Sequence, residues 1–263
     1  MTIIDMHAHV FPDKIAPAAI DSLEGEGGVV AYYDGTVDGL VAAMDRAGVD
    51  RSLIAPVATK ASQVCSINDW VMSLPRTRII PFGAMHPELV DPAAEMARLV
   101  QSGIKGFKLH SHDQDFCPDE PRMSAIYEAA IDAGLIILFH AGGFPVAHGF
   151  ESRPVHFSRM LDQHPGLRCI LAHMGSYLFW DEVREHLLGK NVHFDTAYVP
   201  GNLPDAEFVA LMRDHGVDKV MFGSDGPWTD AAVEIAHLRR LGLTLAEERA
   251  IFAENAERLL GER

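Results

Sequence analysis

Short apolar runs alternate with amphipathic segments along this chain. The runs are rich in Ile, Val, Leu and Phe and are nearly all apolar, which is typical of parallel strands covered on both faces. Eight strands are predicted, at residues 2–9, 52–57, 79–85, 104–110, 135–140, 168–173, 192–196 and 220–224. The alternation therefore predicts a series of βα units.

The segments between these runs have helical spacing and helix-start signals. Thr36 is placed to cap a helix, and Asp91 followed by Pro92 has the form of another helix start. Gly103 is placed to end that second helix. Further helices are predicted at residues 122–133, 155–163, 180–188, 205–215 and 230–241, with one or two more at 245–260.

Eight βα units within 263 residues predict an α/β fold, a single-domain (β/α)₈ TIM barrel. An open, doubly wound sheet is the alternative, but no Gly-rich phosphate motif follows the first strand. Because no linker divides the chain, residues 1–263 are predicted to form one domain. Residues 10–35, 111–121 and 141–154 form unusually long stretches after strands, where we expect functional loops.

Net charge, cysteine spacing and the lack of long apolar runs disfavour several classes of protein. The net charge of −15 argues against a nucleic-acid partner, which usually requires a basic patch. Cys65, Cys117 and Cys169 lie far apart, with no zinc-knuckle spacing, so reduced thiols and a cytoplasmic location are expected. No apolar run reaches the ~18 residues of a membrane span. The first residues lack the basic region and long apolar region of a signal peptide.

Histidines and an aspartate end several of the predicted strands. His7 and His9 end the first strand, and side-chain alternation directs them to the same face. Such a pair is weak evidence alone, because 14 histidines produce pairs by chance. In a barrel, however, His140, His173 and Asp225 would arrive at the same end from three other strands. Nitrogen and oxygen donors that converge in this way predict a Zn²⁺-type metal site.

The order and spacing of these motifs resemble the amidohydrolase superfamily. The nearer match is the amidohydrolase-related branch, which includes aminocarboxymuconate-semialdehyde decarboxylase and several lactone hydrolases. The residues that carry the resemblance are Asp5-x-His7-x-His9, His140, His173-x-Gly175, Gly223-Ser224-Asp225-x-Pro227 and the stretches 44–50 and 255–261. The resemblance spans the whole chain.

The resemblance implies roles for the matching residues. His7, His9 and His140 would bind the metal, with Asp225 as a fourth ligand or near-ligand that also moves protons. His173 would be a second catalytic residue, which polarises the substrate or orients a metal-bound water. The expected cofactor is one divalent metal, with Zn²⁺ first and Mn²⁺ as the alternative.

Lys108 leaves three interpretations open. In some superfamily members, a lysine at this strand position is carboxylated and bridges two metals, which would add a second metal here. Lys108 is otherwise expected to bind a substrate anion or to lie in an internal ion pair.

Four further residues are substrate-binding candidates. His110 is equally well explained as a loop histidine, whereas Arg153 is better explained as a surface arginine than as a ligand of a substrate carboxylate. Phe11 and Trp228 follow metal-site motifs and would form an apolar wall, or they pack at the barrel mouth.

Two aspartates are expected to support the site. Asp195 either orients a ligand histidine or caps its strand. Asp5 shares a face with His7 and is expected to make buried hydrogen bonds.

The primary functional expectation is a hydrolase of a small polar lactone, ester or amide, acting through a metal-activated water. The alternative is a metal-dependent, non-oxidative decarboxylase on the same scaffold. Some of these decarboxylases have Glu where this chain has His7, but others keep the histidine. His7 is therefore compatible with both the hydrolase and the decarboxylase. A chain length that is short for such decarboxylases favours hydrolysis.

A non-catalytic, metal-binding barrel is a third possibility, disfavoured because the set of predicted ligands is complete. The resemblance also implies a small-molecule substrate and a homodimer.

Overall fold

The computed structural model of the protein describes residues 1–143 and 152–262. These residues group into two compact units, and each unit is assembled from separate segments of the chain. The first unit contains Met1–Ile54, Pro75–Ile80 and His193–Arg263. The second contains Ala55–Leu74 and Pro81–Val192.

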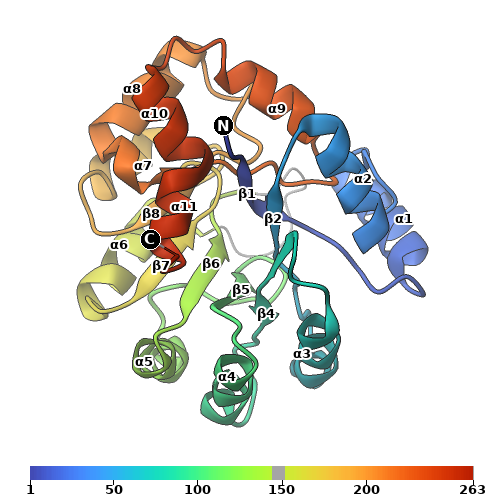
Figure 1. The fold of residues 1–263 in the computed structure, drawn as a ribbon. Coiled ribbons are helices and arrows are strands. Elements are labelled where there is room, and N and C mark those ends of the chain that lie inside the picture. Colours follow the sequence, from blue (N-terminus) through green and yellow to red (C-terminus); the bar gives the residue numbers. More distant parts are fainter. Residues whose placement is uncertain (144–151, 263) are drawn as a thin grey trace. The chain divides into compact units, whose positions relative to one another are not determined.

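Parallel strands form the centre of the first unit (Figure 1). Strands β1 (Ile4–Ala8), β2 (Arg51–Ile54) and β3 (Ile79–Pro81), which begins in this unit, are hydrogen-bonded in that order. Strands β8 (His193–Asp195) and β9 (Val220–Met221) form a second parallel pair. The Met6 amide donates to the Phe222 carbonyl at 2.8 Å, which connects β1 to the residue that follows β9.

Helices of the first unit follow the predicted pattern closely. The Thr36 side chain accepts a hydrogen bond from the Gly39 amide at 2.9 Å, as the cap prediction requires. The tail predicted at 245–260 is two α-helices joined by a π-helical turn. The helical elements are α1 (Ala16–Gly27), α2 (Val37–Ala47), α8 (Asp205–His215), η3 (Val217–Lys219), α9 (Ala231–Leu238), α10 (Leu245–Arg249), η4 (Ala250–Glu254) and α11 (Asn255–Leu259).

The second unit contains four parallel strands in sequence order. They are β4 (Gly83–Ala84), β5 (Gly106–His110), β6 (Ile136–His140) and β7 (Arg168–Leu171). The register places His110 beside His140, so two candidate histidines end neighbouring strands. A Cβ atom at Gly106 would lie 2.3 Å from the Ile136 carbonyl oxygen and 2.5 Å from the Phe82 ring, so only glycine permits this approach.

Helices α3, α4 and α5 lie side by side next to the strands of this unit (Figure 1). The Asp91 side chain caps α4 by accepting from the Ala94 amide at 2.9 Å, as predicted. The helical elements are η1 (Ala61–Gln63), α3 (Val64–Ser73), α4 (Pro92–Gln101), η2 (Pro121–Met123), α5 (Ser124–Ala133), α6 (Pro154–Gln163) and α7 (Trp180–His186).

All eight predicted strand regions contain strand, although the third is divided into β3 and β4 at Phe82. Two helices lie where none was predicted. Helix α1 occupies much of the expected long loop at 10–35, and α3 lies between the second and third predicted strands. Residues 144–151 of the loop predicted at 141–154 lie outside the described residues. Among the described helices, none has the length and apolar character needed to cross a bilayer.

Candidate metal centre

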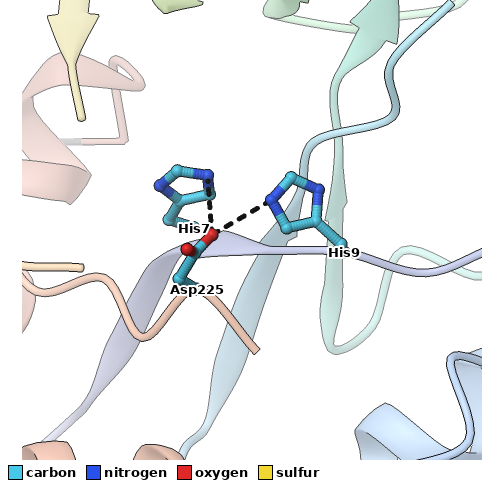
Figure 2. A group of neighbouring side chains, drawn as sticks. All are labelled: His7, His9 and Asp225. Carbon is cyan, nitrogen blue, oxygen red and sulfur yellow. Dashed lines mark hydrogen bonds and ion pairs between the residues drawn. The ribbon is translucent and has the colours of Figure 1, made fainter. Parts of the chain in front are cut away.

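Two imidazoles converge on one carboxylate oxygen in the first unit (Figure 2). The Nε2 atoms of His7 and His9 lie 3.3 Å and 3.1 Å from Oδ1 of Asp225. The three donor groups offer ligand atoms that all lie within 4.8 Å of one another. The structure thus brings together three of the residues that the sequence predicted as metal ligands.

The backbone explains why these side chains meet. His7 lies on β1 and His9 just beyond it, while the Asp225 amide donates to the His7 carbonyl at 2.8 Å. Asp225 has a positive φ of 66°, which is uncommon for a residue other than glycine. Such left-handed backbone conformations cluster at functional sites, where surrounding contacts hold them. The conformation places the carboxylate against both imidazoles.

Asp195 fixes the orientation of the His7 ring. Its Oδ2 lies 2.9 Å from His7 Nδ1, and both side chains are buried. Asp195 Oδ1 accepts from the Ala197 amide at 3.1 Å, so the residue both orients the histidine and caps its strand. A proton held at Nδ1 by Asp195 would leave the Nε2 lone pair of His7 directed toward Asp225.

This donor set fits a divalent cation. A neutral His7 with its proton on Nδ1 places a lone pair opposite a carboxylate oxygen, and this contact is repulsive without a positive charge. A metal ion held between the two groups would make the contact favourable. Imidazole nitrogen and carboxylate oxygen suit both Zn²⁺ and other divalent ions such as Mn²⁺.

Asp5 supports the centre through buried hydrogen bonds, as predicted. Its carboxylate accepts from the Ser224 hydroxyl at 2.6 Å, the Ser224 amide at 2.9 Å and the His7 amide at 3.1 Å. Burial raises the pKa of Asp5 to about 7, although these hydrogen bonds oppose the rise. Asp5 therefore connects β1 to the segment that carries Asp225.

The second unit contains a cluster of histidines at the ends of its strands. The rings of His110 and His140 stack with centroids 4.2 Å apart. His173 Nε2 lies 3.2 Å from His140 Nδ1. Burial, followed by nearby His110, His173 and Lys108, holds the pKa of His140 well below its usual value. A neutral imidazole with an available lone pair is the form that binds metals.

His173 is held by its backbone in this cluster. Its φ is 60°, again in the left-handed region, and its carbonyl accepts from Trp180 Nε1 at 3.0 Å. Lys108 is only 1% exposed on β5, two residues before His110, so its ammonium group is enclosed by protein. The structure places these predicted residues together within the second unit.

The remaining substrate-binding candidates lie in different settings. Arg153 makes a bidentate ion pair with Glu182 and lies 4.2 Å above the centre of the Phe179 ring, so its charge is already matched within the protein. Phe11 and Trp228, in the first unit, are partly buried. Their contact with a substrate stays a prediction.

A second donor group was not predicted from the sequence. Cys117, Asp119 and His156, all in the second unit, offer ligand atoms within 4.8 Å of one another. No sequence signal indicated this group, because its residues lie in a connection and a helix rather than at the ends of predicted strands.

Comparisons with known proteins agree with the fold. A family model described as amidohydrolase matches residues 4–261. An uncharacterized TIM-barrel protein from Bordetella bronchiseptica superimposes with a TM-score of 0.79 at 17% identity, covering 100% of this chain and 99% of that chain. The likeness confirms the predicted α/β barrel class. A search of curated proteins finds no match.

Two similar solved structures are decarboxylases with bound manganese. One is 5-carboxyvanillate decarboxylase from Novosphingobium aromaticivorans, with a TM-score of 0.75 at 19% identity, covering 99% of this chain and 96% of that chain. The other is dihydroxybenzoic acid decarboxylase from Polaromonas, with a TM-score of 0.76 at 18% identity, covering 100% of this chain and 98% of that chain. Each also holds a nitro-substituted phenolic compound.

Proposed function

This chain belongs to the amidohydrolase family, and from that premise we propose that it is a metal-dependent carboxy-lyase. Its substrate would be a small aromatic acid with a ring hydroxyl group, from which it removes CO₂. The observation that carries the proposal is the convergence of His7 and His9 on Asp225, with Asp195 fixing the His7 tautomer.

The comparisons favour the lyase over the hydrolase that the sequence placed first. Both manganese-bound relatives act on benzoic acids with ring hydroxyls, by their names. Manganese in both relatives also makes Mn²⁺ at least as good a candidate as Zn²⁺ for this centre.

Decarboxylation needs a group that accepts electron density and a group that supplies a proton. A divalent cation at His7, His9 and Asp225 would supply Lewis acidity to a substrate oxygen. When the bond between the ring carbon and the carboxylate breaks, its electron pair stays on the ring carbon, which must take a proton as CO₂ leaves. Asp225, whose side chain is 13% exposed, would take up that proton and deliver it to the ring carbon.

Several of the predicted site residues lie in the second unit. His140 as a metal ligand, His173 as a catalytic residue, and Lys108 and His110 as substrate-binding residues stay sequence predictions. A buried lysine is chemically suited to a carboxylate substrate, because an acidic protein needs a local cation to hold an anion. Metal content of His140→Ala and the KM of Lys108→Met test the first and third of these roles.

The test measures CO₂ release by the full chain loaded separately with Mn²⁺ and Zn²⁺. The panel contains hydroxybenzoic acids, lactones, esters and amides. We expect CO₂ and the decarboxylated phenol in equal amounts, and a rate loss of about 10²–10⁴-fold in Asp225→Asn. Asp205→Asn, which removes an exposed carboxylate beside His237, is the matched control with an unchanged rate.

Labelled water separates the two activities. Incorporation of ¹⁸O into a carboxylate product without CO₂ would support the hydrolase and overturn the lyase proposal. Equal rates for the wild type and Asp225→Asn on the whole panel would favour a protein that binds metal without catalysis.

A further inference from the structure

Three metal-binding side chains meet outside the centre described above. In the second unit, Cys117, Asp119 and His156 place a sulfur, a carboxylate oxygen and an imidazole nitrogen within 4.8 Å of one another. The thiol donates to Asp119 Oδ1 at 2.8 Å. All three residues are partly buried, so the group is accessible to an ion yet shielded from bulk water.

The cluster connects two segments that follow neighbouring strands. Cys117 and Asp119 lie in the connection after β5, and His156 lies in the first turn of α6, after β6. The connection is held by the buried Tyr127 hydroxyl, which donates to the Pro118 carbonyl at 3.0 Å. The Glu120 amide also donates to the Cys117 carbonyl at 3.1 Å. The donors are therefore carried by a backbone with defined contacts.

We propose that Cys117, Asp119 and His156 form a second divalent-metal site, with Zn²⁺ as its preferred occupant. Thiolate, imidazole and carboxylate are the protein ligands that Zn²⁺ takes in tetrahedral sites, at metal–ligand distances of ~2.0–2.3 Å. Neighbouring ligand atoms in such a tetrahedron lie about 3.5 Å apart. The three ligand atoms of this cluster lie within 4.8 Å of one another, and three protein ligands would leave a fourth position for water.

A nucleophilic role explains the cluster less well. Burial and the hydrogen bond to Asp119 raise the pKa of the Cys117 thiol to about 12, so the thiolate does not form at neutral pH without a nearby cation. Burial, the largest cause, lowers the pKa of His156. A metal ion would replace the thiol proton and neutralise Asp119 at the same time.

Arg159 and Arg153 are basic residues that act electrostatically on His156 of the cluster, and Arg159 also contacts Asp119. Arg159 Nη1 is 3.4 Å from Asp119 Oδ2, but the arginine side chain is 61% exposed. Because the side chain is long and reaches solvent, it can move away when a cation binds.

The decisive experiment uses cobalt, because sulfur distinguishes this cluster from the centre at His7, His9 and Asp225. Co²⁺ bound to a thiolate gives an intense charge-transfer absorption that nitrogen and oxygen ligands do not give. We expect this absorption in the Co²⁺-loaded full chain and its loss in Cys117→Ser. Cys65→Ser, which removes an exposed cysteine, is the matched control that keeps it.

Zinc content provides the second readout. The Cys117→Ser protein is expected to hold about one Zn²⁺ per chain fewer than the Cys65→Ser protein, because the proposal adds one zinc site. The double variant His7→Ala/His9→Ala should lose the other metal and keep the cobalt–thiolate absorption. The two centres can therefore fail independently: an active enzyme without this absorption would overturn only the present proposal.

A labelling experiment covers the case in which Cys117→Ser does not fold. In the Cys65→Ser protein, a thiol reagent should modify Cys117 more slowly when Zn²⁺ is present, with peptide mass spectrometry locating the label. Labelling of Cys117 that is unchanged by Zn²⁺, or a cobalt absorption that persists in folded Cys117→Ser, would overturn the proposal.

Discussion

At the scale of single residues, the orientation of His7 decides whether its Nε2 is available to a metal. The buried hydrogen bond to Asp195, 2.9 Å long, holds the ring and its tautomer. We expect Asp195→Asn to weaken metal affinity by about 10–100-fold, because the amide can present its NH₂ group and favour the wrong tautomer. Competition with a chelator of known affinity measures the change.

Asp205→Asn is the control for this prediction. Asp205 also contacts a histidine, since its Oδ1 lies 2.7 Å from His237 Nε2, but it is 61% exposed. Its substitution should leave metal affinity unchanged. Equal weakening in both variants would show that net charge, rather than the orientation of His7, controls the affinity.

The residues of the first metal centre were predictable because each ends a predicted strand. The alternation rule places His7 and His9 on one face, and the rule for barrels brings Asp225 to the same end. The Cys117 cluster had no such signal, since its residues lie in a connection and a helix. Their proximity depends on where α6 lies relative to the connection after β5, and local spacing in the sequence does not predict that.

At the scale of elements, Asn68 explains how a helix is joined to a very short strand. On α3, its side-chain amide donates to the Ala84 carbonyl at 3.1 Å and to Glu95 at 2.8 Å, and its oxygen accepts from the Ala84 amide at 2.7 Å. The side chain thus satisfies both backbone groups of Ala84 on β4.

Replacement of Asn68 should therefore be costly. We expect Asn68→Ala to lower the free energy of unfolding by about 2–4 kcal/mol, because it leaves two buried backbone groups and Glu95 without this partner. Urea denaturation measures the change. Asn202→Ala, which removes an exposed asparagine that donates to the Tyr198 carbonyl, should change it by under about 0.5 kcal/mol. A similar small change in both variants would contradict the prediction.

Asn68 also accounts for the failure to predict α3. A polar residue lies on the buried face of that helix between Val64 and Val71, which interrupts the apolar pattern. Helix α1 was missed for a related reason: among the residues of this helix whose burial is described, only Ala16 and Ile20 are buried, so it offers little apolar face to detect. Helices with strong caps, such as those after Thr36 and Asp91, were predictable.

The start of α10 provides a pH-dependent prediction. Glu247 accepts from the Thr244 amide and pairs with Arg213, and these contacts lower the pKa of Glu247 to about 2, with the arginine as the larger cause. A pKa that is lower in the folded state stabilises the fold above the usual value near 4.5, and this contribution disappears as pH falls toward 2.

We therefore expect Glu247→Gln to lower Tm by about 1–2 °C at neutral pH, with the difference from the wild type shrinking below about pH 4. Thermal unfolding followed by circular dichroism over this pH range measures it. Glu248→Gln, one residue along the same helix, is the matched variant. A difference that stays constant with pH would exclude the ionised carboxylate as its cause.

At the scale of the whole molecule, the chain path bears on the prediction of one domain. The first unit takes three separate segments of the chain and the second takes two, so the chain crosses between the units repeatedly. Independent domains usually consist of continuous segments joined by linkers. We therefore expect the chain to unfold in a single cooperative transition.

Tryptophans report on each unit separately. Trp228 lies in the first unit, and Trp70 and Trp180 lie in the second. Variants that keep one tryptophan and replace the others with phenylalanine should give coincident urea midpoints by fluorescence, because each unit is assembled from discontinuous segments of the chain. A midpoint for Trp228 that differs from that for Trp180, with circular dichroism showing two steps, would instead establish two domains and limit the barrel likeness to the arrangement of strands.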